Sequence, residues 1–345
     1  MVALWAPVAC SAGVAAGSLR AVRMERNVVS NPFEVDGVWL KAALHTHSKR
    51  SDGELDPAAH VRHHEWMGFD VCAITDHWTV TSEPSTEHLL VIKGAELAVD
   101  PVGKGRYTEI LAIGIEDIPE DPGGDRVHWQ PIDNYYFKTF ADLSAAGLHI
   151  ASQGGVSFIA HPYWSGLPLE VLLEAENVEG VELFNSSAER DNGRGDSSYM
   201  WDLTLEAGKR FSGFATDDCH YPGFDIGDAW TMVKAAERSE AAFLDALRAG
   251  MTYASSGPVI HDVQVDGDAV EVRCSPARSV VLMSRYETGW SVRADGRGRQ
   301  EDARILERDD AGLIVRARFL PQMALPYRRL VVESTQGRKA WTNPL

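Results

Sequence analysis

Cysteine is scarce in this chain of 345 residues, and the few cysteines lie far apart. The four are Cys10, Cys72, Cys219 and Cys274, and no two of them form a C-x-x-C pair. Disulfide-rich scaffolds and zinc sites built on cysteine both need closely spaced cysteines, so neither is expected here. The pattern suits a reducing compartment, and we expect a cytoplasmic protein.

Basic residues are also in short supply. The chain has 33 Lys and Arg against 50 Asp and Glu, a formal net charge of −17. A surface this negative repels phosphate backbones and anionic lipid, so long nucleic acids and membranes are poor partners. A small anionic substrate held by a metal remains compatible with that charge.

The sequence lacks an apolar run that is long enough to cross a membrane. Its first 22 residues are small and apolar, but no basic residue precedes the apolar stretch, which makes them a poor signal peptide. We interpret residues 1–36 as an N-terminal extension, partly artefactual, with Met24 as the expected start.

Length and charge both divide the chain. At about 150 residues per domain, two domains are expected, or one barrel of about 250 residues with a small partner. Residues 256–345 carry 14 basic and 12 acidic residues, whereas residues 1–255 carry 19 and 38. The longer part also holds eleven of the twelve histidines. Imidazole and carboxylate side chains together are what a metal site uses.

Between Trp39 and Ala235, apolar runs of strand length alternate with helical patterns, one of them over Lys138–Gln153. Near-continuous apolar strands are typical of a parallel sheet buried on both faces. Seven or eight such strands in about 220 residues predict a closed barrel over residues 37–255. The alternative is an open doubly wound sheet, but no glycine-rich phosphate loop follows the first strand.

The pattern changes after Gly257-Pro258. Apolar and polar residues now alternate with period two, and Asp266-Gly267 supplies a hairpin turn. We predict a small antiparallel β-sandwich over residues 256–345.

Side chains that bind metals stand at the C-terminal ends of the predicted strands. In chain order they are His45, His47, Asp52, His77, Glu96, His161, Asp218 and His220. The carboxyl ends of parallel barrel strands meet at one mouth, so we expect these groups to converge. Eight donors are too many for one tetrahedral ion and suit two or three zinc, manganese or iron ions. Five of the eight are imidazoles, which disfavours magnesium or calcium alone.

Five motifs in this order resemble those of the polymerase-and-histidinol-phosphatase (PHP) superfamily of metallohydrolases. They are "LHTHSKRSDG", "AITDH", "GAE", "AHP" and "ATDDCH". The resemblance covers about residues 39–254 and implies a distorted (β/α)7 TIM-like barrel with a di- or trinuclear metal centre. The lead-in to the first motif and the appended β-domain are similar to the carbaryl-hydrolase-like branch of the superfamily.

The resemblance also implies how the ligands divide among the ions. His45, His47, Glu96 and Asp218 would share one ion, and Asp52, His77 and His220 would hold another. Glu96 would bridge to a further ion that His161 also holds. Many relatives carry a histidine on the next strand, where this chain has Glu109. Glu109 is either a ligand of that further ion or a polar strand residue beside a dinuclear centre.

The expected chemistry is hydrolysis by a metal-bridged hydroxide. Asp52 and Asp218 are candidate acid–base groups, and Asp76 is a candidate for orienting a neighbouring ligand. Candidate substrate-binding residues lie in loops that follow the strands: Lys49, Arg50, Tyr163, Trp164, Arg190, Arg194 and Tyr221. His60 and His64, spaced i, i+4 on a predicted helix, are expected to face solvent.

Three functions remain open at this point. The first is a phosphoesterase acting on a small phosphorylated substrate. The second is a hydrolase of carboxylic ester, carbamate or amide bonds, which the same metal chemistry would serve. The third is a non-catalytic binding protein with a degenerate barrel, which the nearly complete ligand set disfavours.

Overall fold

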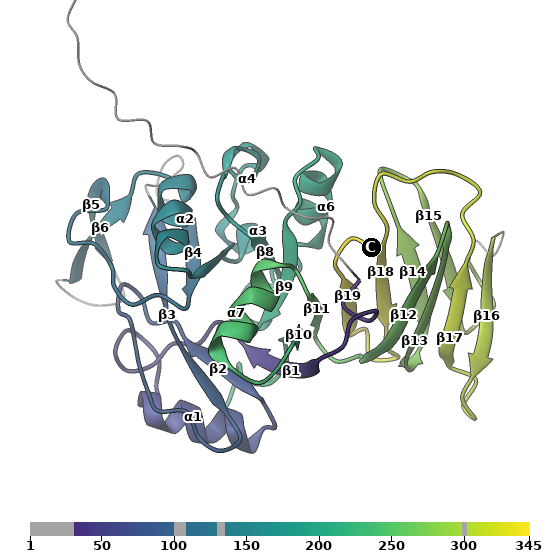
Figure 1. The fold of residues 1–345 in the computed structure, drawn as a ribbon, viewed down its shortest axis with the longest axis horizontal. Helices are drawn as coiled ribbons and strands as arrows, with labels where there is room; N and C mark the ends of the chain where they lie inside the picture. Colours follow the sequence, from purple (N-terminus) through teal and green to yellow (C-terminus); the bar gives the residue numbers. More distant parts are fainter. Residues whose placement is uncertain (1–30, 100–107, 130–134, 299–301) are drawn as a thin grey trace, which may run out of the picture.

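The structure is a computed structural model that describes residues 31–99, 108–129, 135–298 and 302–345. It shows a mixed α/β protein with a 15-stranded sheet and a second, four-stranded sheet (Figure 1). The α/β class predicted from the sequence is therefore confirmed. Most of the predicted N-terminal extension, including Met24, lies outside the described residues. Within the described ranges, no helix is both long enough and apolar enough to span a membrane.

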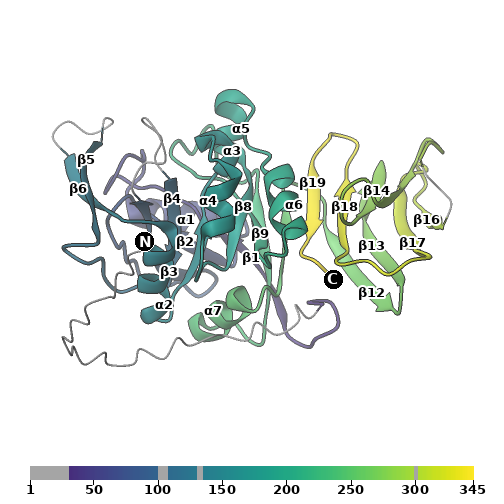
Figure 2. The ribbon, with the colours of Figure 1, turned by 90° about the horizontal axis from the view of Figure 1, so that it is seen from above.

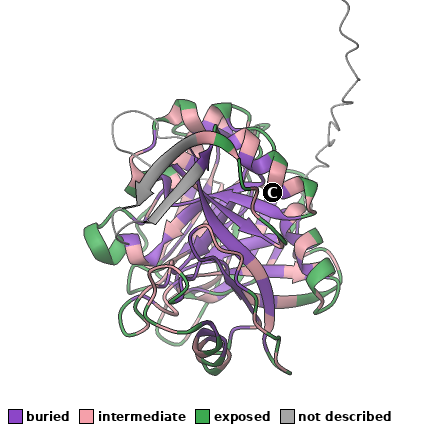
Figure 3. Ribbon diagram, turned by 90° about the vertical axis from the view of Figure 1, so that its left-hand side faces the viewer, coloured by how far each residue is buried: buried purple, intermediate pink, exposed green. Residues whose placement is uncertain are grey.

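The first part of the chain alternates strands with helices. Its strands are β1 (Val38–Ala43), β2 (Val71–Ile74), β3 (Leu90–Val99), β4 (Thr108–Ile113), β5 (Gly123–Trp129), β6 (Tyr135–Phe140), β7 (Val156–Ile159), β8 (Gly180–Asn185), β9 (Ser212–Thr216), β10 (Trp230–Ala235) and β11 (Thr252–Ser255). Its helices are α1 (Pro57–Trp66), α2 (Leu143–Ser152), α3 (Pro162–Ser165), α4 (Leu169–Glu174), α5 (Ser186–Asn192), α6 (Ser198–Glu206) and α7 (Glu240–Arg248). The strands are largely buried, and the helices around them expose their outer faces (Figure 3).

The prediction of a parallel sheet is wrong at several strands. β1, β2 and β3 pair in parallel, as do β7, β8 and β9, but β4 runs antiparallel to both β3 and β7. Only the eight residues 100–107 separate β3 from β4, and a parallel crossover needs about a dozen or more. β10 likewise runs antiparallel to β1 and β11. Apolar runs reflect burial on both faces, and they do not encode strand direction.

Strands β9 and β10 stand at the two ends of the run β10-β1-β2-β3-β4-β7-β8-β9. The Thr231 hydroxyl in β10 donates to the carbonyl oxygen of Ala215 in β9 at 2.9 Å, and it accepts from the Ala215 N–H at 3.2 Å. A hydroxyl can donate one hydrogen bond and accept others, so one side chain joins the two end strands.

The structure moves the start of one predicted helix, α2, and contains a helix, α5, that was not predicted. The helix expected from Lys138 begins at Leu143, because the Asp142 carboxylate accepts from the N–H of Ala145 at 2.8 Å and caps it there. The preceding residues form β6, which pairs with β5. Helix α5 is absent from the prediction; Asn185 caps it by accepting from the N–H of Ala188.

Helix α1 buries the two histidines that were expected to face solvent. His60 and His64 are both 0% exposed. His64 Nδ1 lies 2.9 Å from the carbonyl oxygen of His60, and its ring meets that of Phe69 edge-on at 5.2 Å. Burial lowers the pKa of His60 to about 4 and that of His64 to about 3, so both are neutral near pH 7. A neutral imidazole can pack in the interior as a small ring. The i, i+4 spacing of two histidines does not show whether their side of the helix is buried.

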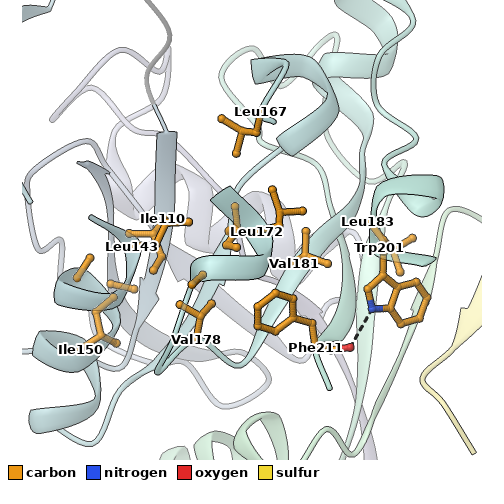
Figure 4. Close-up of a cluster of buried hydrophobic side chains, with 14 of the residues drawn as sticks. Ile110, Leu143, Ile150, Leu167, Leu172, Val178, Val181, Leu183, Trp201 and Phe211 are labelled. Atoms are coloured by element: carbon orange, nitrogen blue, oxygen red, sulfur yellow. Dashed lines mark hydrogen bonds between the residues drawn. The ribbon is translucent and has the colours of Figure 1, made fainter. Parts of the chain in front are cut away.

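The largest apolar core lies between the sheet and helices α2, α4 and α6 (Figure 4). Trp201 of α6 is fully buried there, and its indole N–H donates to the carbonyl oxygen of Phe211 at 2.8 Å. The other side chains labelled in the figure are Ile110, Leu143, Ile150, Leu167, Leu172, Val178, Val181 and Leu183. This core holds the outer helices against the sheet. The strand ends that precede these helices therefore rest on tightly packed side chains.

In its described residues, the C-terminal part forms only strands and turns (Figure 2). The strands are β12 (Ile260–Asp266), β13 (Ala269–Ala277), β14 (Ser279–Met283), β15 (Gly289–Arg293), β16 (Ala303–Arg308), β17 (Ile314–Phe319), β18 (Arg329–Glu333) and β19 (Lys339–Thr342). Their pairs are antiparallel, as the period-two pattern predicts. β19 also pairs with β11, so the large sheet continues from the first part of the chain into β19, β18, β14 and β15.

A buried ion pair joins α6 to β18. The Arg329 guanidinium is 1% exposed and donates two hydrogen bonds to the Asp202 carboxylate, at 2.7 and 2.6 Å. The same guanidinium stacks over the ring of Trp201 at 5.0 Å. A cation this deeply buried depends on its partner, because water does not solvate it.

We expect Asp202→Ala to destabilise the fold by about 3–5 kcal/mol, because it leaves Arg329 buried without its counter-ion. The double variant Asp202→Ala/Arg329→Met should recover most of that loss, which urea denaturation would measure. Glu333→Ala is the matched control, since it removes the partner of the exposed Arg278 on the same sheet. Equal destabilisation by Asp202→Ala and Glu333→Ala would contradict the prediction.

Candidate metal centre

The nine side chains predicted as ligands come from loops and strand ends across the large sheet. His45 and His47 follow β1, and His77 follows β2; Glu96 and Glu109 lie within β3 and β4. His161 follows β7, and Asp218 and His220 follow β9. The structure brings all of them, with Asp52, into four overlapping groups: His47, Asp52, His77 and His220; His45, His161 and Asp218; His45, His47 and Glu96; His77, Glu96 and Glu109. In each group the potential ligand atoms lie within 4.8 Å of one another.

Two imidazole nitrogens lie close to two carboxylate oxygens at the centre of the cluster. His45 Nε2 lies 3.0 Å from His47 Nε2, 3.2 Å from Glu96 Oε2 and 3.1 Å from Asp218 Oδ1. His47 Nε2 lies 3.1 Å from the same Glu96 oxygen and 3.2 Å from the same Asp218 oxygen. Both imidazoles are 0% exposed, and Glu96 is 1% exposed.

Each carboxylate oxygen closes a triangle of donor atoms with the two imidazole nitrogens. The sides of both triangles, 3.0–3.2 Å, match the separation of two ligand atoms that each lie about 2 Å from one cation. Asp218 Oδ1 is a buried acceptor with no hydrogen-bond partner among the described residues. Protons on both Nε2 atoms, 3.0 Å apart, would instead place two N–H groups against each other.

A second group gathers around Asp52. Its Oδ1 lies 3.4 Å from His47 Nδ1, and its Oδ2 lies 3.3 Å from His220 Nε2 and 3.8 Å from His77 Nε2. His220 Nδ1 lies 3.0 Å from the carbonyl oxygen of Asp218. A donated hydrogen bond there leaves Nε2 of His220 unprotonated and able to bind a cation.

A third group surrounds the Glu96 and Glu109 carboxylates. His161 Nε2 lies 3.2 Å from Glu96 Oε1 and 3.6 Å from Glu109 Oε2. His77 Nδ1 lies 3.4 Å from Glu96 Oε2 and 3.7 Å from Glu109 Oε1. Glu96 therefore contacts imidazoles through both oxygens, and Glu109 faces the same two histidines.

The carboxylates govern the protonation of this cluster. Burial lowers the pKa of His45, but the carboxylates of Asp218, Glu96 and Glu182 outweigh it and raise the pKa well above its ordinary value. The same competition raises the pKa of His47 to about 10 and that of His161 to about 9. The site thus favours positive charge, whether it is carried by protons or by metal ions.

Glu109 responds in the opposite way. Burial, followed by the charge of Glu96, raises the pKa of Glu109 to about 8. Two carboxylates this close do not both ionise unless a cation lies between them. The position therefore suits a ligand that ionises when a cation binds.

Glu182 is a buried carboxylate that the motifs do not reveal. It lies in β8 and accepts from the N–H of His161 at 2.7 Å, from the Asn185 side chain at 3.0 Å and from the Thr216 hydroxyl. Its Oε1 also lies 3.1 Å from His45 Nδ1. Carboxylates behind metal-binding histidines fix the ring orientation and raise its basicity. One charged residue inside the apolar strand "GVELFN" is the signal that could have found it.

Asp76 organises the loop that carries Asp52. Its carboxylate accepts from the Ser48 N–H and hydroxyl at 2.6 and 2.7 Å, and from the hydroxyls of Ser51 and Thr81 at 2.8 and 2.6 Å. The Ser51 hydroxyl in turn lies 3.2 Å from Asp52 Oδ1. Asp76 thus acts on Asp52 through the loop.

Two of the potential ligands have an uncommon backbone conformation. His161 has φ 24° and Asp218 has φ 55°, which place both in the left-handed region. Non-glycine residues there cost about 1–3 kcal/mol each, and they cluster at functional sites. The Glu182–His161 and Asn185–Asp218 hydrogen bonds, 2.7 and 3.1 Å, hold these two residues in place.

The predicted cationic substrate-binding residues are exposed, and some are already paired. Lys49 Nζ lies 3.5 Å from Asp56. Arg190 forms an ion pair with Asp228 and lies over the Phe224 ring at 5.5 Å. Arg194 lies over the ring of Tyr163 at 5.8 Å.

The predicted aromatic residues lie beside the cluster. The ring of Trp164 meets that of His161 at 5.0 Å, and the ring of Tyr221 stacks near that of His220 at 6.2 Å. Tyr163 is 44% exposed. Arg50 is exposed in the loop after β1, where its N–H donates to the Ser48 hydroxyl at 3.2 Å.

No protein-family model matches the sequence, and no curated protein does. Among solved structures, the chain resembles a two-domain protein from Bacteroides vulgatus that contains a predicted PHP-like metal-dependent phosphoesterase. They share 17% identity, 93% of this chain and 99% of that one are covered, and the TM-score is 0.49.

It also resembles an amidohydrolase from Chromobacterium violaceum, with 18% identity, 54% and 89% coverage and a TM-score of 0.38. A lesion-specific endonuclease from Pyrococcus furiosus matches with 11% identity, 61% and 56% coverage and a TM-score of 0.42. Because each TM-score is below 0.5, we base the proposed function on the site.

We expect Glu182→Gln to weaken metal binding by about 10- to 100-fold, the usual effect of losing a group that orients a ligand. The amide nitrogen would face donors where an oxygen now accepts, so His45 and His161 would lose their support. Calorimetric titration of the chelator-treated protein with Mn²⁺ measures this.

Glu179→Gln is the matched control, because Glu179 is a buried carboxylate that precedes the same strand and accepts from Ser157. Unchanged Mn²⁺ affinity in Glu182→Gln, or an equal loss in Glu179→Gln, would remove the assigned role of Glu182.

Proposed function

We propose that this protein is a metal-dependent hydrolase, and specifically a phosphoesterase that acts on a small phosphorylated substrate. One observation carries the proposal: nine imidazole and carboxylate side chains converge, and His45 and His47 both lie 3.1–3.2 Å from oxygens of Glu96 and Asp218. The ordered motifs of the PHP superfamily agree with it.

We propose two or three divalent transition-metal ions, held as the resemblance implies. His45, His47, Glu96 and Asp218 would hold one ion, which the short distances from both imidazoles to the two carboxylates support. Asp52, His77 and His220 would hold a second, and Glu96, Glu109 and His161 a third; the contacts around Asp52 and around Glu96 support these groups. When bound, such ions supply a water-derived nucleophile at neutral pH and offset negative charge in the transition state.

The protein's own residues would position the metal ligands and transfer a proton to the leaving group. Glu182 holds His45 and His161, and Asp76 holds the loop that carries Asp52. Asp52 is 19% exposed and Asp218 is 13% exposed, so both are accessible beside their ligand roles. They are our candidates for moving a proton to the leaving group.

We also propose the finer architecture that the sequence predicts. The strands of residues 37–255 would form a distorted TIM-like barrel, and residues 256–345 a β-sandwich domain. The Thr231–Ala215 link between the end strands supports the first. A separate apolar core that includes Val263, Val280 and Phe319 supports the second.

We expect His45→Ala and Asp218→Ala each to lower the rate of hydrolysis more than about 100-fold. This exceeds the usual effect of removing a residue that only orients a metal ligand. The assay is Mn²⁺-reconstituted protein with p-nitrophenyl phosphates, beside p-nitrophenyl esters and naphthyl carbamates. His261→Ala is the control, since His261 is an exposed histidine in β12.

Metal analysis of the wild-type protein should find two or more ions per chain. Turnover confined to the esters and carbamates would reject the phosphoesterase reading, and an absence of metal after supplementation would reject the hydrolase altogether. Full activity in either ligand variant would remove the site assignment.

A further inference from the structure

We propose that the loops after β7, β8 and β9 form a platform that binds a planar aromatic group of the substrate beside the metal centre. The inference rests on the proposed function, because it names the substrate class of that site: small phosphomonoesters that carry an aromatic ring. The platform consists of Tyr163, Trp164, Arg190, Arg194, Tyr221 and Phe224.

The platform exposes four large rings, two after β7 and two after β9. Tyr163 is 44%, Trp164 41%, Tyr221 50% and Phe224 47% exposed. Rings of this size gain most by burial, so several exposed together mark a surface that a binding partner covers. Loops positioned by a rigid sheet are where such binding surfaces usually lie.

Contacts between the loops make the platform continuous. The indole N–H of Trp164 donates to Asp191 Oδ2 at 3.2 Å, which ties the loop after β7 to α5. The Arg194 guanidinium lies over the Tyr163 ring at 5.8 Å. Arg190 lies over the ring of Phe224 at 5.5 Å, which extends the platform to the loop after β9.

The platform reaches the metal centre at both ends. The Trp164 ring contacts the ring of His161, with centroids 5.0 Å apart. The Tyr221 ring lies 6.2 Å from that of His220. A molecule lying on these rings is therefore against two potential ligands, which places its reacting bond at the centre and favours a substrate over a distant protein partner.

The chemistry of the platform suits a flat ring rather than a second anion. Ring faces and guanidinium planes both stack on planar aromatic groups. Arg190 already pairs with Asp228, so it offers a face more than a free charge. The phosphoryl group would lie at the cations of the centre, and the ring on the platform. The chain's net charge of −17 opposes a long polyanion and leaves a small molecule.

The test compares two phosphonates of equal charge, benzylphosphonate and ethylphosphonate, which the enzyme does not hydrolyse. Calorimetry with the Mn²⁺-reconstituted full chain should show benzylphosphonate binding about tenfold tighter, the effect of roughly one stacked ring. In Tyr163→Ala and Phe224→Ala the ratio of the two affinities should fall towards one. Binding of ethylphosphonate in each variant reports whether the metal centre is intact.

Tyr286→Ala is the matched control. Tyr286 is 63% exposed and also has an arginine, Arg285, over its ring, but it lies in the C-terminal part, after β14. It should keep the wild-type ratio. Equal affinities in the wild type, or a ratio that survives both platform variants, would overturn this inference and leave the proposed function standing. Failure of both phosphonates to bind the metal-loaded protein would overturn the two together.

Discussion

Buried negative charge is the constraint on which the candidate centre depends. Asp52, Glu96, Glu109, Asp218 and Glu182 lie within one cluster, and four of them are less than 14% exposed. Carboxylates in such a place are costly unless cations and hydrogen bonds balance them. The imidazoles balance this charge when they are protonated, which is why the pKa values of His47 and His161 rise to about 10 and 9. Divalent ions would balance the same charge and bind the facing Nε2 atoms of His45 and His47 without a proton on either.

The surrounding fold holds these groups in place through hydrogen bonds and packing. His161 and Asp218 occupy left-handed backbone, and Glu182 and Asn185 bind them by hydrogen bonds from the neighbouring strand. Such a conformation persists only where the surroundings determine it strongly. The strands that carry these residues pack on the apolar core beneath α2, α4 and α6, so the polar cluster rests on a rigid base.

The sequence predicts the meeting of the nine side chains because β1, β2, β3, β7 and β9 run in the same direction, so their carboxyl ends lie at one edge. Glu109 joins them because it lies at the N-terminal end of the reversed strand β4. His45 and His47 share a face by their spacing, and that argument needs no knowledge of the sheet. Strand direction could not be predicted, since the apolar runs of β3 and β4 report burial alone. His60 and His64 escaped prediction for a similar reason: helical spacing fixes a shared face but not whether that face packs inward.

The role of Glu182 could not be predicted, because Glu182 belongs to no motif and its contacts join strands that are distant in sequence. Asp76, by contrast, lies in the motif "AITDH", and the sequence predicts that it orients a neighbouring ligand. In the structure, its oxygens are occupied by Ser48, Ser51 and Thr81. A local motif identifies which residues face the centre, whereas long-range hydrogen bonds determine which residues support them.

Ion pairs join the C-terminal strands to the segments around α5 and before β10. Asp228, in the segment that leads into β10, pairs with Arg190 after β8 and with Arg338 at the turn between β18 and β19. Lys339 pairs in the same way with Asp196, which follows α5. These partners line a cavity of about 340 Å³ between the turn and α5. Arg190 also stacks on Phe224, in the loop after β9. The all-β part therefore contacts elements beside the candidate centre, although it contributes none of the nine potential ligands.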